Sequence, residues 1–361
     1  MTMDARRDKS SDVQISQGAV AGSRTRAVKE LKRRFMRNDL LLSALFFAAM
    51  LAAPLFPDVK GWMLSQASLV IIYIIAALGV LVLVGFTGLV SVGHGGFLAI
   101  GAYTSALLTL HLNVDLVVGI IAGMAMAGAI GAVLALIFLR LSGAFMAIGT
   151  LGFAFFVGTV LNNVPFFQGR DGILLDANHV LGLEIGDHGF YYVSTICLIL
   201  VTLFVFALAN SGTGRAFMAL RDAEKAAMSS GVNRLKYRTL AFTLSAAITG
   251  IAGALNAHVV NYVSAEVFAD IWYSVDILMA VVVGGSTIIF GPFLGGFFVV
   301  MLPFFFEQLA DFSFILKGAV LILVLRFAPA GIMELLVRPL KNARRRLLRK
   351  TGGSMAAEGD G

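Results

Sequence analysis

Long apolar stretches, separated by short polar connections, make up most of this chain of 361 residues. Several stretches reach or approach the roughly 20 apolar residues that an α-helix needs to cross about 30 Å of hydrocarbon. The pattern therefore predicts an all-α polytopic membrane protein with about ten transmembrane helices. The predicted helices lie near residues 40–56, 63–84, 89–110, 115–139, 143–162, 190–209, 239–260, 272–289, 292–310 and 313–328.

A glycine-rich segment interrupts this pattern at 85–103, where the sequence reads GFTGLVSVGHGGFLAIGAY. Glycine costs a helix about 1 kcal/mol relative to alanine, and unpaired backbone groups in hydrocarbon cost more. Such a segment persists at membrane depth only where it packs against other helices or lines a cavity, and broken helices of this kind mark solute pathways in transporters. We therefore predict that the break lines a solute pathway. The candidate residues are Gly85, Ser91, Gly93, His94, Gly95 and Gly96.

Two polar residues within the predicted spans each allow two interpretations. His94 could touch the solute, but we favour a structural role in which the imidazole satisfies broken backbone. Asp276 lies early in the eighth predicted span, and an acid within a membrane is costly and by default functional. Packing of Asp276 against an arginine or backbone amides is the alternative.

A third pattern within the spans is simpler to interpret. Small residues at every fourth position predict a helix-packing face. These residues are Gly119, Gly123, Ala127 and Gly131.

Composition and charge agree with a membrane protein, since 58% of the residues are hydrophobic and 14% are charged. The net charge of +7 comes from basic clusters near the spans, at 24–37, 215–238 and 338–350. The connections at 163–188 and 261–271 are acidic instead. Because basic connections remain on the cytoplasmic side, we predict cytoplasmic termini, a cytoplasmic loop at 210–238 and an external loop at 163–188. This distribution explains the positive charge without a nucleic-acid partner.

The chain ends are predicted to be basic cytoplasmic tails, disordered at 1–38 and in contact with lipid headgroups at 336–361. The permease domain lies between them, at 39–335. A signal peptide competes for 40–56, but the polar leader is too long for a usual n-region. The single cysteine, Cys197, lies in an apolar run, so we expect neither an intrachain disulfide nor a cysteine-based metal site.

The loop at 210–238 predicts two short helices. Ser211 or Thr213 can cap the first helix, Asp222 can cap the second, and Gly231 can end it in a left-handed conformation. The second helix would present a face of small residues against which another protein can pack closely. These residues are Ala223, Ala226 and Ala227. A solvated basic loop is the alternative.

The stretch KAAMSSG, from Lys225 to Gly231, resembles the Glu-Ala-Ala-x-x-x-Gly motif of ABC-importer permeases. A lysine stands in the place of the glutamate, with Glu224 next to it. In that family the motif forms a coupling helix seated in a groove of the ATPase subunit. The resemblance implies that the ATPase contact includes Asp222, Glu224, Lys225, Ala226, Ala227 and Gly231.

Three further blocks resemble the LivM-type permease family of branched-chain amino-acid ABC importers. They are GFTGLVSVGH at 85–94, ALRD at 219–222 with the segment continuing to 255, and GGS at 284–286 followed by GPFLGG at 291–296. The blocks follow the family order, and the resemblance covers roughly residues 63–335. Gly284 and Gly285 join Asp276 in the predicted solute pathway. At 168–173 the sequence QGRDGI departs from the Thr-Gly-Gly-type stretch of the family, which leaves the solute open.

The resemblance implies a permease subunit of an ABC importer of type II architecture, in a bacterial plasma (inner) membrane. It would carry branched-chain amino acids or a related small polar solute. The implied partners are a second permease subunit (homologous or a second copy), two cytoplasmic ATPase subunits, an external solute-binding protein and membrane lipid. The chain has no Gly-x-x-x-x-Gly-Lys-Ser/Thr loop, so we expect it to bind no nucleotide cofactor and to be no enzyme.

Other classes of membrane protein could also contain broken helices. An ion-coupled secondary transporter should show more buried carboxylates and needs no alanine-faced loop, whereas a urea or amide channel could use a glycine-lined pore. A membrane-embedded enzyme would need clustered His, Asp or Cys at the bilayer surface, and the sequence shows no such cluster. ATP-dependent uptake would distinguish the ABC permease from these alternatives.

Overall fold

The computed structural model describes residues 47–48, 50–52, 54, 60–138, 143–168, 171–175, 178–180, 182–268, 270–305, 313–328 and 331–333. The chain divides into two units, Met1–Ala53 with Val337–Gly361, and Pro54–Leu336. The elements described below belong to the second unit. The predicted tails at 1–38 and 336–361, and most of the predicted helix at 40–56, lie outside the described residues.

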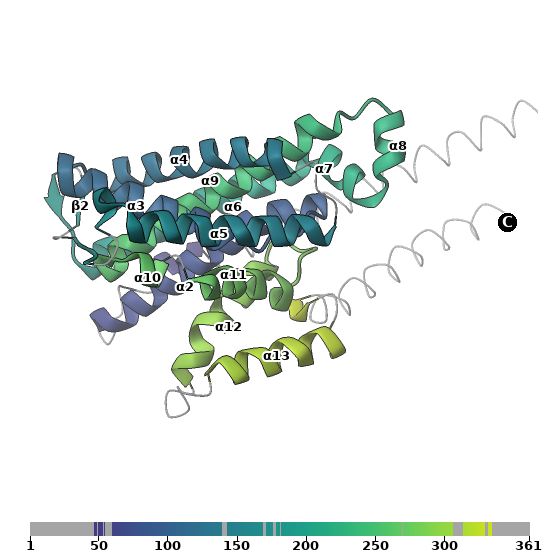
Figure 1. Ribbon diagram of the computed structural model, residues 1–361. Coiled ribbons are helices and arrows are strands. Elements are labelled where there is room, and N and C mark those ends of the chain that lie inside the picture. The colour runs from purple at the N-terminus through teal and green to yellow at the C-terminus, as the bar shows by residue number, and fades with distance from the viewer. Residues whose placement is uncertain are drawn as a thin grey trace, which may run out of the picture. The chain divides into compact units, whose positions relative to one another are not determined.

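The second unit is built almost entirely of helices (Figure 1). The long ones are α2 (Gly61–Val80), α3 (His94–Leu112), α4 (Leu116–Phe138), α5 (Ala144–Asn163), α6 (Asp187–Asn210) and α9 (Arg234–Val260). The shorter ones are α7 (Gly212–Asp222), α8 (Glu224–Ser229), α10 (Ala265–Phe268), α11 (Ile271–Gly284), α12 (Gly291–Phe305), α13 (Ser313–Phe327), the π-helix η2 (Leu81–Gly85) and the 3-10 helix η3 (Pro165–Phe167). Four short strands are β1 (Ile173–Leu174), β2 (His179–Val180), β3 (Leu183–Glu184) and β4 (Tyr262–Val263).

Seven helices within the described residues are long and apolar enough to cross a membrane. This confirms the predicted all-α polytopic class. The predicted ninth and tenth spans, α12 and α13, have 15 residues each. At 1.5 Å per residue each is about 22 Å long, which is less than the hydrocarbon core of about 30 Å. The described part of the chain therefore contains fewer full-length spans than the sequence predicted.

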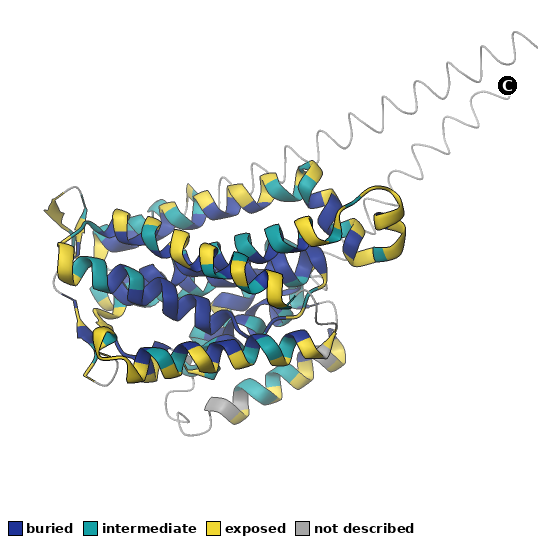
Figure 2. Ribbon diagram, turned by 45° about the horizontal axis from the view of Figure 1, so that its top comes forward, coloured by how far each residue is buried: buried dark blue, intermediate teal, exposed yellow. Residues whose placement is uncertain are grey.

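Side-chain burial matches a bundle that is surrounded by lipid. Buried residues line the helix faces that point into the bundle, and exposed residues cover its outer faces (Figure 2). These outer faces are apolar: Val133 on α4, Phe156 on α5 and Leu200 on α6 are all more than half exposed. Apolar side chains over such large outer faces are expected where hydrocarbon replaces water.

The centre of the bundle is α9, which packs along α2, α3 and α4. Glycines let these backbones approach closely, because no side chain separates them. A Cβ added at Gly101 of α3 would meet the carbonyl of Gly250 on α9, and one added at Gly253 would meet the carbonyl of Leu98. Backbone of α3 therefore lies directly on backbone of α9 at these positions.

The small residues of α4 extend the same packing, which confirms the predicted helix-packing face. A Cβ added at Gly123 would lie 3.0 Å from the Gly101 carbonyl oxygen of α3. One added at Gly131 would lie 2.5 Å from the Cβ of Ala246 on α9. The fourfold spacing thus brings α4 against both α3 and α9.

The two kinds of connection lie at opposite ends of the bundle. β2 and α10 lie at one end, and α7 and α8 lie at the other (Figure 1). At the first end β1 pairs with β4 in antiparallel register, so the predicted external connections at 163–188 and 261–271 meet. This separation matches the predicted threading of the chain, while the side of the membrane on which each end lies stays a prediction.

Candidate transport site

The predicted break begins where α2 gives way to the π-helix η2. π-helical turns are rare and are frequently found at functional sites. The backbone then turns at Gly88 (φ +71°), a conformation that favours glycine. Helix α3 starts at His94, five residues later than the predicted span at 89–110, because the intervening backbone is not helical.

His94, the first residue of α3, is held by two hydroxyl groups. Its Nε2 lies 2.7 Å from Ser245 Oγ of α9, and its Nδ1 lies 3.2 Å from Ser91 Oγ. The Ser245 hydroxyl donates to the Gly79 carbonyl at 2.6 Å, so it accepts a hydrogen bond from His94 Nε2. The imidazole is therefore held by hydroxyl groups and not directly by carbonyls of the break, and contact of His94 with a solute stays a prediction. The Ser245 hydroxyl thus links the imidazole of α3 to a backbone carbonyl of α2.

The glycines around His94 let neighbouring helices converge on the start of α3. The Gly95 N–H donates to Ser274 Oγ of α11 at 2.8 Å. A Cβ added at Gly96 would lie 3.0 Å from Phe153 Cε1 of α5, and one added at Gly93 would meet the Thr150 carbonyl. These glycines are thus required by close packing, whereas their contact with a solute stays a prediction.

Asp276 of α11 forms an ion pair with Lys317 of α13. Lys317 Nζ lies 2.7 Å from Oδ2 and 3.0 Å from Oδ1, and the two side chains are 17% and 11% exposed for Lys317 and Asp276 respectively. The carboxylate is therefore paired with a basic residue, a lysine where the structural alternative had named an arginine or backbone amides, and its contact with a solute stays a prediction. Lys317 was not among the predicted site residues. A lysine in the first half of an apolar run was the available signal.

Gly284 and Gly285 lie where α11 ends and the chain turns into α12. Gly285 adopts φ +113°, which stops the helix. A Cβ added at Gly284 would meet the Gly291 carbonyl at the start of α12. The segment also approaches the first break, because a Cβ added at Gly85 would meet the Ser286 carbonyl. The structure thus brings the two predicted pathway segments together.

The loop between α6 and α9 folds as two short helices, as the sequence predicted. Ser211 caps α7 by accepting a hydrogen bond from the Gly214 N–H at 3.1 Å. Gly231 follows α8 with φ +86°, which confirms the predicted left-handed stop. The predicted cap on α8 is wrong: the N-cap position is Ala223, and the Asp222 carboxylate accepts from Arg221 Nε at 2.8 Å instead.

The side chains of α8 do not all face outward. Ala227 is buried against its own chain, so the expectation that it faces a partner is wrong. Lys225 and Ala226 are exposed instead, as is Met228. A six-residue helix that packs on the bundle must bury one side, and the sequence alone did not show which alanine lies there.

Glu224 fastens α8 to the start of α9. Its carboxylate lies 2.8 Å from Arg234 Nε and 2.8 Å from Arg238 Nη2. Arg238 is largely buried, so the pair restricts how α8 can move relative to α9. Glu224, which is next to Lys225 of the family-like motif, therefore has a defined structural role. Its position in the sequence alone did not show this role.

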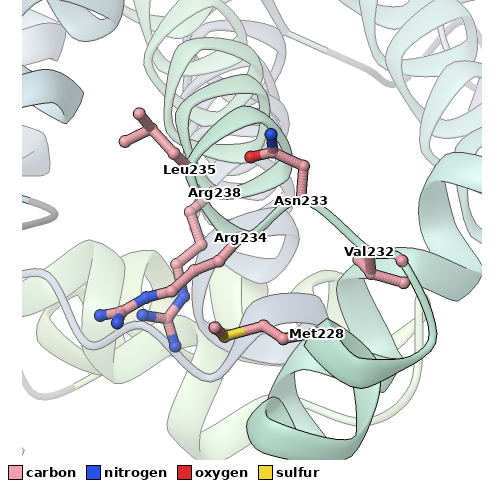
Figure 3. Close-up of a pocket in the computed structure, with 7 residues that line it drawn as sticks. Met228, Val232, Asn233, Arg234, Leu235 and Arg238 are labelled. Carbon is pink, nitrogen blue, oxygen red and sulfur yellow. The ribbon is translucent and has the colours of Figure 1, made fainter.

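A pocket of about 590 Å³ lies between α8 and the start of α9 (Figure 3). Its lining residues are Met228, Gly231, Val232, Asn233, Arg234, Leu235 and Arg238. Met228 and Leu235 are about half exposed and form an apolar rim, while Arg234 and Arg238 supply positive charge. Within the described residues, no group of three or more His, Cys, Asp or Glu could hold a metal ion.

A family model described as branched-chain amino acid transport system / permease component matches residues 62–325. The chain belongs to this permease family. The match spans the helix break, the α7–α8 loop and the α11–α12 turn. The permease is accordingly a multi-pass membrane transport protein, as its apolar helices indicate.

Individual relatives agree with this assignment. The permease is 34% identical over 304 residues to the high-affinity branched-chain amino acid transport system permease protein LivM of Escherichia coli (strain K12), covering 76% of this chain and 71% of the relative. It is 33% identical over the same shares to LivM of Salmonella typhimurium. A shorter match, 32% identical over 128 residues (34% of this chain and 38% of the relative), is to the probable ABC transporter permease protein YphD of Escherichia coli. No solved structure matches the chain.

Proposed function

We propose that this permease forms the membrane path of an ABC importer for branched-chain amino acids or a related small polar solute. Membership of the permease family across 62–325 carries the proposal. Separate cytoplasmic ATPase subunits would supply the energy, and an external binding protein would deliver the solute. A second permease subunit, either homologous or a second copy, would complete the path in the plasma membrane.

The α7–α8 loop is the proposed ATPase contact. It lies at the end of the bundle opposite β2 and α10 (Figure 1), and its outer face carries Lys225, Ala226 and Met228. The adjoining pocket combines an apolar rim with two arginines that share one carboxylate, Glu224, so a net positive charge remains. This suits a partner that inserts apolar side chains and presents a carboxylate. In this orientation the loop and both termini are cytoplasmic.

Uptake of radiolabelled leucine into intact cells, which retain the external binding protein, tests the proposed transport function. Cells with and without the gene should differ in concentrative uptake, and ATP depletion should abolish the difference. A protonophore added while ATP is maintained should leave it unchanged. Uptake that collapses with the proton gradient would indicate an ion-coupled transporter, and equilibration without accumulation would indicate a channel.

Cysteine labelling tests the orientation. In a Cys197→Ala background, Glu184→Cys should react with an impermeant thiol reagent added outside intact cells, because Glu184 lies on β3 and is exposed. Ser229→Cys on α8 should react only after the membrane is opened. The reverse pattern would place α7 and α8 outside and exclude an ATPase contact there.

Ala226 provides the test of the ATPase contact. Ala226→Arg adds bulk and charge to the exposed side of α8, so co-purification of the ATPase should be lost while the permease still inserts. Ala226→Ser at the same position keeps the side chain small and should retain the ATPase. If both variants retain a bound ATPase and transport normally, the loop is only a connection between α6 and α9.

A further inference from the structure

The side chain of Arg221, at the end of α7, bridges the cytoplasmic loop and the helix break. Its Nη1 donates to the Gly85 carbonyl at 2.5 Å, across 136 positions of sequence. Its aliphatic stem lies on Gly88, where an added Cβ would be 2.9 Å from Arg221 Cγ. One arginine therefore contacts the break at two points, the end of η2 and the left-handed turn that follows.

The Gly85 carbonyl is available to Arg221 because the nearby backbone N–H groups donate to the carbonyls of other residues. The Gly88 N–H donates to the Val84 carbonyl at 3.1 Å, and the Leu89 N–H donates to the Leu83 carbonyl at 3.4 Å. A carbonyl left in this way at the end of a helix needs a partner from elsewhere. Arg221 provides that partner.

Asp222 orients the guanidinium group. Arg221 Nε donates to Asp222 Oδ1 at 2.8 Å while Nη1 reaches Gly85. The planar guanidinium fork can direct donors to two acceptors at once, whereas a lysine places its donors on a single nitrogen. Asp222 therefore holds the guanidinium of Arg221 in place, a different role from the predicted capping of α8.

The connection between α8 and Arg221 is short and well packed. Only Ala223 separates α7 from α8, and the last turns of α7 are anchored by Phe217 and Leu220, which are 0% and 1% exposed. A displacement of α8 that shifts the end of α7 must therefore move Arg221 as well. The contact continues to the second glycine segment, because Gly85 lies against Ser286.

We propose that Arg221 is the positioning residue that transmits movement of the α7–α8 loop to the helix break, and thereby couples ATP hydrolysis to solute passage. The inference rests on the proposed ATPase contact. Coupling between distant sites requires an element whose arrangement both sites bias, and the π-helix with its glycine turn is that element. Because coupling of binding free energies is reciprocal, solute bound in the path should change the affinity of the permease for its ATPase subunits through the same side chain.

A reconstituted transporter containing the ATPase and binding-protein subunits tests the proposal. Arg221→Ala should lower solute uptake per ATP hydrolysed by about tenfold, within the range measured for residues that carry coupling between sites. Arg221→Lys should recover only part of the lost uptake per ATP hydrolysed. Lysine keeps the positive charge, but its single nitrogen cannot contact Asp222 and Gly85 together as the guanidinium does. A merely structural defect would reduce the amount of inserted permease and leave this ratio unchanged.

Arg215→Ala is the matched control. Arg215 lies on the same helix, and its side chain donates to the Asn210 carbonyl within the loop rather than to the break. Its uptake per ATP hydrolysed should equal that of the wild type. If Arg221→Ala and Arg215→Ala behave alike, Arg221 does not transmit coupling. If the wild-type permease binds no ATPase at all, the proposed function fails first, which is a distinguishable result.

A double-mutant cycle tests the contact without transport. Gly88→Ala should lower the thermal midpoint of the purified permease, because the new Cβ meets Arg221 Cγ and the backbone has φ +71°. In an Arg221→Ala background only the backbone strain remains, since Arg221 Cβ lies 3.7 Å away. Gly88→Ala should therefore lower the thermal midpoint less in the Arg221→Ala background than in the wild type. Additive shifts would show that the arginine stem does not lie on Gly88 and would overturn the proposal.

Discussion

The centre of the bundle and its C-terminal helices are held together by different forces. Between α3 and α9 backbone lies directly on backbone at Gly101 and Gly253, and side-chain contacts such as His94 with Ser245 add to this packing. Between α11 and α13, within the described residues, the ion pair of Asp276 with Lys317 supplements the packing of two helices of 14 and 15 residues. Close packing has no tolerance for added atoms, whereas an ion pair depends on both partners being charged.

The difference shows which part of the permease is rigid and which part can rearrange. Backbone contacts along two long helices are lost only if the helices separate. An ion pair can break and form again while both helices remain in place, at a cost set by desolvation of the two charges. We therefore expect α13 to move relative to α11 and to the α3–α4–α9 centre during transport.

The largest effect is expected from Gly253→Leu in the centre. A Cβ at this position would meet the Leu98 carbonyl and lie 3.0 Å from the Ala102 nitrogen, so leucine must push α3 and α9 apart. Overpacking of this kind costs about 3 kcal/mol or more where backbone cannot yield. Folded permease should be absent from the membrane, as judged by size-exclusion chromatography in detergent.

Gly152→Leu is the control for this variant. An added Cβ at Gly152 on α5 meets nothing within 4 Å, so the same substitution should leave a monodisperse protein. Equal behaviour of the two leucine variants would contradict the claim that backbone contact holds the centre together.

The second-largest effect is expected from Asp276→Asn, which leaves Lys317 charged without its partner. Removing one member of a largely buried pair should cost about 2–3 kcal/mol, seen as a lower thermal midpoint. Asp276→Asn with Lys317→Gln should recover most of this loss, since no unpaired charge remains. A double variant no more stable than the single one would show that the pair does not join α11 to α13.

Ser245→Ala should have a moderate effect and tests whether directional bonds matter in the packed centre. The substitution removes the hydroxyl that links His94 Nε2 to the Gly79 carbonyl. Leaving these buried groups unpaired should cost about 1–2 kcal/mol in unfolding experiments. Ser229→Ala, which removes an exposed hydroxyl from α8, should be neutral. Equal stability of the two alanine variants would mean that packing alone holds the break.

The smallest effect is expected at the loop, from Asn233→Ala. The Asn233 side chain caps α9 by accepting from the Lys236 N–H at 3.0 Å, and loss of such a cap costs about 1 kcal/mol. Asn233→Asp should preserve the cap and the thermal midpoint. An unchanged midpoint for Asn233→Ala would show that Glu224 and its arginines alone fix the start of α9.

Local patterns in the sequence predicted much of the fold and part of the site. Apolar runs located the long helices, because burial in hydrocarbon demands many consecutive apolar residues. Glycine spacing identified the packing face of α4 and the interruption before α3. The left-handed stop at Gly231 also followed from its neighbours, since the ends of helices depend on a few adjacent residues.

Partner choice was decided by the tertiary structure. His94 meets Ser245 across 151 positions, Asp276 meets Lys317 across 41, and Arg221 meets Gly85 across 136. No periodicity in the chain relates these residues. The burial of Ala227 likewise depends on how α8 packs against the bundle. The sequence by itself determined which segments become helices and where they break, because those properties arise from neighbouring residues. Only the folded bundle decided which polar groups meet, because distant segments must first be brought within hydrogen-bonding distance.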